Sequence, residues 1–333
     1  MRPLVLLVAL GLAGCVTTDV AEPPVDVRPS LPRSLPIAGI SGMVEVAPGR
    51  YLVVFDAKAA EAGPRLGLVT VDAVGGLSFG ALAVADWRHP DGPASDLEGA
   101  CSLGDGEALV IESGTWGGRY GRLFHLRLGD REAEVLHVAP LPVLVGSGPD
   151  VDGDNYEGLA CMEAPGGVVL VLLGERGGSA AYSDGLIRWG LYDRDRGTLD
   201  VTEAGRRGVP VVAPAGFTRA IGGLHLDPSG ALWSAATTDP GDAGPFRSLV
   251  YRIGTVRPER PVPLAVEPAG GGCRIDGFKV EAVAAGPAAG PAAGPALAVG
   301  TEDELYGGTW RPLDCDELPP LPRPSTSGSS PRR

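Results

Sequence analysis

The segment DVDGDNYEGLACMEAPGGVVLVLLGERG, residues 150–177, combines an acidic loop, a Glu-Gly pair, a short apolar strand, a tight turn and a second apolar strand. The turn falls at Pro165-Gly166-Gly167, where proline and glycine favour a chain reversal. A looser copy, SDLEGACSLGDGEALVIESG, occupies residues 95–114 with the same order of features. Two copies of one hairpin indicate that the chain is built from repeats.

Five such units can be traced by a glycine that opens a short apolar strand. Their glycines are separated by 57, 59, 65 and 54 residues. The five starts are Ile40-Ser41-Gly42-Met43, Leu97-Glu98-Gly99-Ala100, Tyr156-Glu157-Gly158-Leu159, Ile221-Gly222-Gly223-Leu224 and Ile275-Asp276-Gly277-Phe278.

The strands predicted after these starts alternate in polarity. The second strands are Tyr51–Phe55, Ala108–Ile111, Val168–Leu173, Ala231–Ala235 and Ala296–Val299, and later strands are Leu66–Val71, Arg122–Leu128, Ala133–Val138 and Ser248–Ile253. Glycine and proline make up about a quarter of the chain, as frequent turns require. The pattern predicts an all-β fold, a β-propeller of five blades, with six blades as the alternative.

The domain boundaries follow from changes in composition. We expect a signal peptide at residues 1–14, a lipidated Cys15 with a flexible tether over residues 15–36, the propeller at 37–316 and a disordered tail at 317–333. Ala284–Pro295, AAGPAAGPAAGP, is a low-complexity insertion between two strands of the last blade. Ser34–Ile40 is predicted to supply a strand that closes the ring.

The N-terminus indicates the location of the protein in the cell. The chain begins with a basic Arg2, followed by an apolar run over Leu4–Leu12 that is too short to span a bilayer. The run ends in Leu12-Ala13-Gly14-Cys15. This arrangement resembles a bacterial lipoprotein signal, which implies acylation of Cys15 and attachment to a membrane of the cell envelope. Because Val16 and not aspartate follows the cysteine, the resemblance favours the outer membrane.

The formal net charge of −13 makes nucleic acid and anionic lipid surfaces poor partners for the domain. Such a charge suits cations or simple solubility. Four cysteines remain after Cys15, and in an exported protein they are candidates for disulfides. Cys273 and Cys315 bracket the last unit and are predicted to pair. Cys101 and Cys161 either pair or are small buried residues.

The candidate functional residues are acids at repeated positions. The unit starts contribute Asp96, Glu98, Asp154, Glu157 and Asp276, and the ends of the second strands contribute Asp56, Glu112, Glu175, Asp239, Glu302 and Asp303. If both sets meet at one mouth of the channel, they require a metal or nearby cationic groups. The ligand-binding candidates are Glu98, Glu112, Glu157, Glu175, Arg176, Arg219, His225 and Glu302.

The acidic loop itself has two interpretations. Asp150, Asp152, Asp154 and Glu157 are spaced as oxygen ligands for calcium. However, the loop glycine is at the fourth position, and an EF-hand loop needs it at the sixth. The alternative is an acidic turn that connects two blades.

The repeated Glu-Gly starts also resemble the esterase-like phytase family of bacterial propellers. The resemblance covers Ile40 to Leu313 and rests on Asp96-Leu97-Glu98-Gly99-Ala100 and Asn155-Tyr156-Glu157-Gly158-Leu159-Ala160. It implies a propeller with calcium-assisted phosphoester or ester hydrolysis. The first and fourth units depart from the pattern, because Ser41 and Gly222 replace the glutamate. Three functions therefore remain open: cation and small-ligand binding, metal-assisted hydrolysis, and a non-catalytic scaffold for protein partners.

Overall fold

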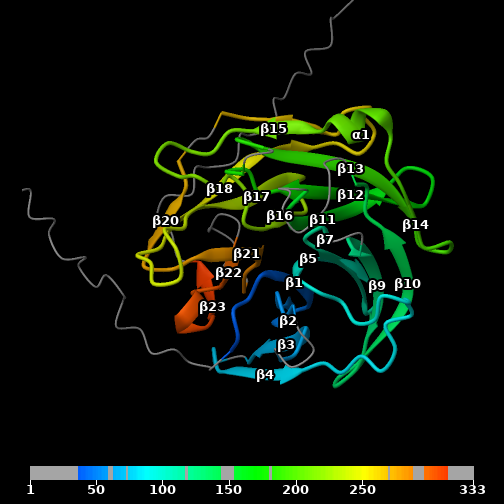
Figure 1. Ribbon diagram of the computed structural model, residues 1–333, viewed down its shortest axis with the longest axis horizontal. Helices are drawn as coiled ribbons and strands as arrows, with labels where there is room; N and C mark the ends of the chain where they lie inside the picture. The colour runs from blue at the N-terminus through cyan, green and yellow to red at the C-terminus, as the bar shows by residue number, and fades with distance from the viewer. Residues whose placement is uncertain are drawn as a thin grey trace, which may run out of the picture.

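The computed structural model describes residues 37–58, 63–72, 74–116, 119–143, 154–179, 182–268, 271–287 and 296–313. Within these residues, five antiparallel sheets of three to five strands surround a central axis (Figure 1). Each sheet begins with an inner strand, and the inner strands of successive sheets contact one another. The predicted all-β fold, a five-bladed β-propeller, is confirmed.

The blades follow the chain in order. The first has β1 (Gly42–Ala47), β2 (Arg50–Val54), β3 (Leu66–Val71) and β4 (Leu77–Ala81), and the second has β5 (Leu97–Gly104), β6 (Glu107–Glu112), β9 (Arg122–Leu128) and β10 (Ala133–Pro140). The third has β11 (Tyr156–Ala164), β12 (Val168–Glu175), β13 (Gly185–Asp193) and β14 (Thr198–Asp200), with β15 (Val209–Val211) also paired to β13.

The fourth blade has β16 (Leu224–Leu226), β17 (Ala231–Thr238), β18 (Arg247–Val256) and β19 (Leu264–Val266), with β20 (Cys273–Asp276) also paired to β18. The fifth has β21 (Val280–Ala285), β22 (Leu297–Thr301) and β23 (Trp310–Leu313). Outside the blades are the short ribbon of β7 (Thr115–Trp116) and β8 (Arg119–Tyr120), the helix α1 (Glu203–Arg207) and the 3-10 turn η2 (Glu304–Tyr306).

One predicted unit start is wrong. Ile275-Asp276-Gly277 belongs to the outer side of the fourth blade, because β20 pairs with β18 through Ser248↔Ile275 and Arg247↔Asp276. The inner strand of the fifth blade is β21, which begins with Val280-Glu281-Ala282. Alanine replaces the glycine of the other four units there, and the nearby Asp276-Gly277 imitates their pattern more closely.

The ring closes where the described chain begins. Ile37 forms a β-bridge with Gly308, and the backbone N–H of Ile40 donates to the carbonyl of Thr301 at 2.8 Å. Residues 34–36 of the predicted closing strand lie outside the described residues. The low-complexity insertion falls between β21 and β22 as expected, although residues 288–295 of it are also outside the described part.

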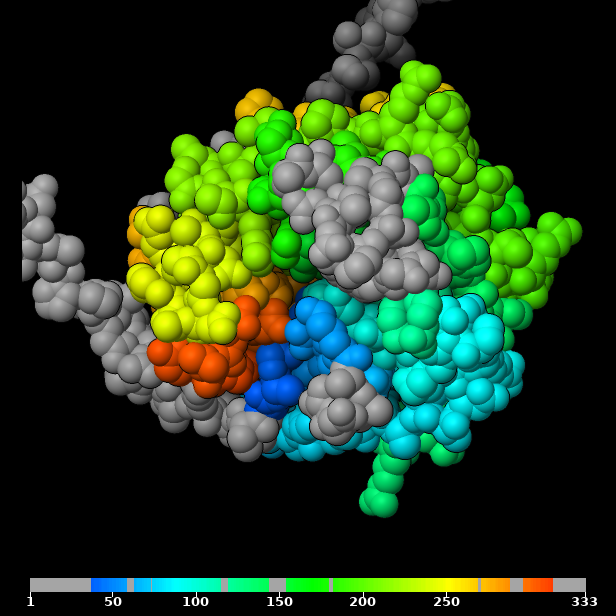
Figure 2. Space-filling view, viewed as in Figure 1, coloured from blue at the N-terminus to red at the C-terminus, as the bar shows by residue number. Residues whose placement is uncertain are grey.

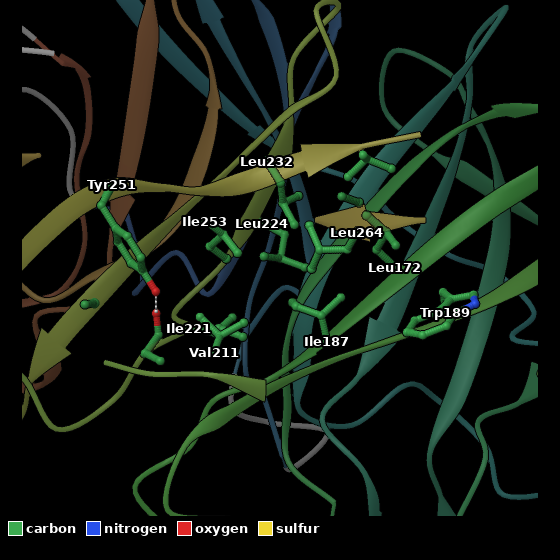
Figure 3. Packing of buried hydrophobic residues seen from close by; sticks show 14 of the residues in the cluster. Leu172, Ile187, Trp189, Val211, Ile221, Leu224, Leu232, Tyr251, Ile253 and Leu264 are labelled. Carbon is green, nitrogen blue, oxygen red and sulfur yellow. Dashed lines mark hydrogen bonds between the residues drawn. The ribbon is translucent and has the colours of Figure 1, made fainter. Parts of the chain in front are cut away.

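The cores lie between neighbouring blades, because the strands present apolar residues on both faces of each sheet. Figure 3 shows such a core between the third and fourth blades, where Leu172 and Ile187 pack against Leu224 and Leu232. The hydroxyl of Tyr251 donates to the carbonyl of Ala220 at 2.8 Å and so leaves no unpaired polar group there. Each fully buried aliphatic side chain contributes about 1.5 to 3 kcal/mol to stability.

The cysteines also join blades. Cys101 of β5 and Cys161 of β11 form a disulfide with a Cα–Cα distance of 5.9 Å, which decides the alternative left open by the sequence. Cys273 is buried in β20 and is itself disulfide-bonded, but its predicted partner Cys315 lies outside the described residues. Among the described helices, none has the length and apolar character needed to cross a bilayer.

Candidate functional site

The two predicted sets of acids meet at one end of the propeller. In each blade the inner strand and the second strand are antiparallel, so the start of the first lies beside the end of the second. The register pairs Leu97 with Glu112, Tyr156 with Glu175 and Val280 with Thr301. The starts of the inner strands and the ends of the second strands therefore share one channel mouth, whereas the predicted member Asp276 lies on the outer strand β20.

Glycine allows the inner strands to approach closely at this mouth. A Cβ atom added to Gly99 would lie 2.8 Å from the backbone nitrogen of Leu159, and one added to Gly158 would lie 3.0 Å from that of Leu224. Glycine is required where backbones come this near to each other. The residues before these glycines are consequently crowded around the axis.

Three glutamates occupy those crowded positions. Glu98, Glu157 and Glu281 are the second residues of β5, β11 and β21, and each lies at a register shift of its strand. Such a β-bulge turns a side chain away from the regular pleat. One carboxylate oxygen from each glutamate lies within 4.8 Å of the other two, and all three residues are buried. We call this group the glutamate triad.

The other two inner strands complete the ring without a carboxylate. Ser41 precedes Gly42 in the first blade, and Gly222 precedes Gly223 in the fourth. Ser41 is 1% exposed, and its hydroxyl has no hydrogen-bond partner among the described residues. An unpaired buried hydroxyl is costly, so Ser41 is a polar group of the inner ring that lacks a partner among the described residues.

Below the triad the channel is closed by apolar side chains. Met43, Ala100, Leu159, Leu224 and Val283 line this level together with the glycines, and no space is left for a water molecule. The face seen in Figure 2 is hollowed near its centre, between the blue first blade and the orange fifth blade. A ligand at the triad must therefore reach it from one end of the channel.

Lys279 supplies the cation that lies deepest in the mouth. Its Nζ lies 2.9 Å from Oε1 of Glu281, 3.1 Å from Oε2 of Glu302 and 3.6 Å from Oδ2 of Asp239. Its side chain is 5% exposed. Although burial opposes its charge, Glu281 and Glu302 raise the pKa of Lys279. Lys279 is therefore a fixed positive charge on one side of the triad.

Two arginines stand at the junction of the third and fourth blades, and one of them, Arg219, shares its partners Asp239 and Glu281 with Lys279. Nη1 of Arg176 lies 3.3 Å from Oε1 of Glu157. Nη1 of Arg219 lies 3.1 Å from Oδ2 of Asp239 and 3.7 Å from Oε1 of Glu281. Both arginines keep about a quarter of their side chain exposed, and the side-chain amide of Asn155 also lies within hydrogen-bond distance of the Arg176 guanidinium.

Burial and mutual repulsion favour the neutral form of the acids in the mouth. Burial, followed by the charge of Glu157, raises the pKa of Glu98 well above its usual value. Burial also raises the pKa of Glu157 and of Glu281, although nearby cationic groups counteract the effect. Burial and then Glu281 raise the pKa of Glu302 to about 9. Without a further cation, the site therefore holds protons at neutral pH.

Asp96 is held in an unusual backbone conformation beside the triad. Its φ is 60°, a region that residues other than glycine adopt rarely and often at functional sites. Its carboxylate accepts a hydrogen bond from the hydroxyl of Ser113 at 2.5 Å and lies 3.2 Å from Nζ of Lys58. The ion pair with Lys58 makes Asp96 part of the rim of the mouth.

Two other predicted acids have local partners. Glu112 is fully buried, pairs with Arg122 and accepts the backbone N–H of Ser95 at 2.8 Å, so it holds its own blade together. Glu175 is fully buried and accepts the N–H of Gly177, but its Oε1 has no hydrogen-bond partner among the described residues. Burial raises the pKa of Glu175 to about 8.

His225 is not brought to the triad. It lies three residues beyond Gly222 on the inner strand, which places it about 10 Å further along the channel. It is half-buried, and burial lowers its pKa to about 4, so its imidazole is neutral at physiological pH.

The predicted calcium loop is only partly described. Asp150 and Asp152 lie outside the described residues, so the loop stays a prediction. The carboxylate of Asp154 accepts a hydrogen bond from the hydroxyl of Tyr182 at 3.1 Å and lies 3.5 Å from Nη2 of Arg188. Asp154 is thus engaged in an ion pair within the third blade, whereas Glu157 belongs to the triad.

Sequence reasoning missed Glu281 and the unpaired Ser41. The signal for Glu281 was present, since Val280-Glu281-Ala282 repeats the apolar residue, glutamate and small residue of Leu97-Glu98-Gly99. Only the close approach of the strands shows that alanine fulfils the role of glycine there. Asp276, which was chosen in its place, is exposed on β20.

Comparison with known proteins yields structures only: no family model and no curated protein matches the chain. A xylan β-1,4-xylosidase from Bacillus halodurans C-125 is 9% identical with a TM-score of 0.48, over 85% of this chain and 54% of that one. The chain thus spans about half the length of the xylosidase, as it does of a β-1,3-galactosidase.

A thermostable family-43 glycoside hydrolase is 10% identical with a TM-score of 0.48, over 84% of this chain and 90% of that one. An exo-1,5-α-L-arabinanase from a bovine ruminal metagenomic library is 13% identical with a TM-score of 0.44, over 84% and 94%. At such identities the similarity concerns the fold, and no activity follows from it.

Proposed function

We propose that this propeller binds a divalent cation of the calcium class at the glutamate triad, and through it a small ligand. The observation that carries the proposal is the meeting of Glu98, Glu157 and Glu281, from three different blades, with ligand oxygens within 4.8 Å of one another. Like charges so close together repel unless protons or a cation neutralise them. A divalent cation supplies that neutralisation.

The donor set suits a hard cation. Calcium takes 6–8 oxygen ligands and tolerates irregular geometry. The three carboxylates offer such oxygens, and the unpaired hydroxyl of Ser41, at the equivalent position of the first blade, would be a further ligand. Because burial raises the pKa values of the triad, we expect cation binding to release protons and to strengthen as pH rises.

A second candidate is a metal-assisted phosphoester or ester hydrolase. It is favoured by Glu281 and Glu302, two carboxyl groups that both contact Nζ of Lys279. Burial raises the pKa of both, that of Glu302 to about 9, so Glu302 carries a proton at neutral pH. Glu302 would then serve as the general acid. A screen of phosphoester and ester substrates with Glu302→Gln as the comparison tests this candidate.

The proposal extends to the location of the protein. The signal around Leu12-Ala13-Gly14-Cys15 supports a lipid-anchored protein of the bacterial envelope, with the outer membrane as its site. Expression of Cys15→Ser tests this location: the variant is expected in the soluble envelope fraction, and its retention in the membrane would contradict the anchor.

Calorimetric titration of calcium into the purified protein tests the cation site. We expect one saturable event and a rise in melting temperature, both abolished by Glu157→Gln and by Glu281→Gln. Glu163→Gln is the matched control, because Glu163 lies on the same strand β11 with 66% of its side chain exposed. Absence of binding, or binding that survives both triad substitutions, would refute the proposed function.

A further inference from the structure

We infer that the mouth binds the cation together with an oxyanion, a carboxylate or a phosphate of a small molecule, held by Arg176 and Arg219. The inference rests on the proposed cation site and specifies the ligand bound there. It starts from the two partly exposed arginines that contact members of the triad.

The two arginines form one surface although they belong to different blades. The carbonyl of Arg176 accepts the backbone N–H groups of Ala220 and Ile221, the residues that follow Arg219. Gly178 lies close to the side chain of Arg219, since a Cβ added to that glycine would be 3.6 Å from Cγ of the arginine. The backbone thus holds Arg176 and Arg219 side by side.

Each arginine contacts one member of the triad. Nη1 of Arg176 lies 3.3 Å from Oε1 of Glu157, and Nη1 of Arg219 lies 3.7 Å from Oε1 of Glu281. When a cation takes the charge of Glu157, Arg176 loses its counter-charge, while Arg219 retains Asp239 at 3.1 Å. An oxyanion that also ligates the cation would supply the counter-charge that Arg176 has lost.

The remaining cationic groups of the mouth are less suited to this role. Lys279 is 5% exposed and already contacts four carboxylates, and Lys58, although 67% exposed, is paired with Asp96. Arg176 and Arg219 instead keep 28% and 24% of their side chains exposed. The planar guanidinium presents paired N–H donors that match the oxygens of a carboxylate or phosphate. These features select an oxyanion at the arginine side.

Calcium titrations in the presence of chloride, acetate or inorganic phosphate test the inference. Micromolar calcium avoids precipitation in the phosphate arm. Linkage requires that an anion bound beside the cation raises calcium affinity, and we expect at least about a fivefold increase over chloride. The acetate and phosphate arms then distinguish a carboxylate from a phosphate ligand.

Substitution of the arginines completes the test. In chloride, Arg176→Gln is expected to bind calcium at least as tightly as the unmodified protein, because a repelling charge is gone; this binding also verifies that the variant is folded. Anions should no longer raise the calcium affinity of Arg176→Gln. In Arg219→Gln they should raise it less than in the unmodified protein. Arg196→Gln, at a residue whose side chain is 80% exposed in the turn between β13 and β14, is the control.

The possible failures are distinguishable. Calcium binding without any anion effect overturns the inference and leaves the cation site standing. An anion effect that persists in Arg176→Gln and Arg219→Gln also overturns it. If calcium does not bind in any anion, the proposed function fails and this inference fails with it.

Discussion

Nζ of Lys279 lies 2.9 Å from Oε1 of Glu281, although only Val280 separates the two residues along the chain. The same ammonium group contacts Glu302, Glu304 and Asp239. Lys279 therefore neutralises, as a tethered cation, part of the carboxylate charge around the triad.

We expect Lys279→Gln to lower the free energy of unfolding by about 3 kcal/mol at pH 8, since it leaves buried carboxylates uncompensated. Calcium affinity should rise on the order of tenfold, because a nearby positive charge is removed. Urea denaturation and calorimetry measure the two effects.

Arg274→Gln provides the comparison for Lys279→Gln, as Arg274 is largely exposed on β20 and pairs only with Asp276 among the described residues. A loss of stability no larger than that of Arg274→Gln would mean that the buried lysine does not compensate these carboxylates.

Glu175 is predicted to make stability depend on pH. Burial raises its pKa from 4.5 to about 8, so the folded protein binds this proton more tightly than the unfolded chain does. Its contribution is therefore most favourable below the unfolded pKa and is lost as pH rises toward 8. We expect Glu175→Gln to match the unmodified protein at pH 4.5 and to exceed its stability by about 1 to 3 kcal/mol at pH 9.

Denaturant midpoints of Glu175→Gln measured from pH 4.5 to pH 9 check this prediction. Glu163→Gln, the exposed control on β11, should keep the pH dependence of the unmodified protein. Parallel curves for Glu175→Gln and the unmodified protein would contradict the raised pKa.

Gly99→Ala tests the close approach of the inner strands. The added methyl group would lie 2.8 Å from the backbone nitrogen of Leu159 and 2.9 Å from its Cβ, so β5 and β11 must separate. We expect a loss of about 1 to 3 kcal/mol, together with weaker calcium binding as the triad spreads. Gly80→Ala, where the new methyl group meets no atom within 4 Å, should change neither property.

The Cys101–Cys161 disulfide links two inner strands across 60 residues of sequence. Replacing both cysteines by alanine should cost about 2 to 4 kcal/mol, because the unfolded chain regains the freedom that the crosslink removed. Urea denaturation without reductant measures the difference. Identical midpoints for the variant and the unmodified protein would show that the crosslink does not limit the unfolded chain.

The repeated hairpins made the propeller predictable. Val168–Leu173 and Ala231–Ala235 lie within β12 and β17, and Leu66–Val71 and Arg122–Leu128 coincide with β3 and β9. These predictions rest on local alternation of apolar residues and on turn-forming glycines, which act within one hairpin. Glu98 and Glu157 were chosen as candidate ligands for the same reason, since each precedes a repeated glycine.

The fifth blade was assigned wrongly because a local pattern cannot show which strand a segment pairs with. In Cys273–Asp276 apolar and polar residues alternate and a glycine follows, but the segment pairs with β18 at the outside of the fourth blade. Glu281, five residues after Asp276, belongs to the triad only because β21 packs between β1 and β16. That placement depends on contacts between blades.

The sequence by itself determined the architecture of five repeated hairpins, the acidic character of the chain and the kinds of residue available for a site. Tertiary structure alone decided that Glu98, Glu157 and Glu281 meet, that Glu112 is held in a separate ion pair, and that Arg176 stands beside Arg219. The physical reason is the separation in sequence of the residues that interact. Hairpin formation depends on neighbours in sequence, whereas closure of the ring sets the distances between residues of different blades.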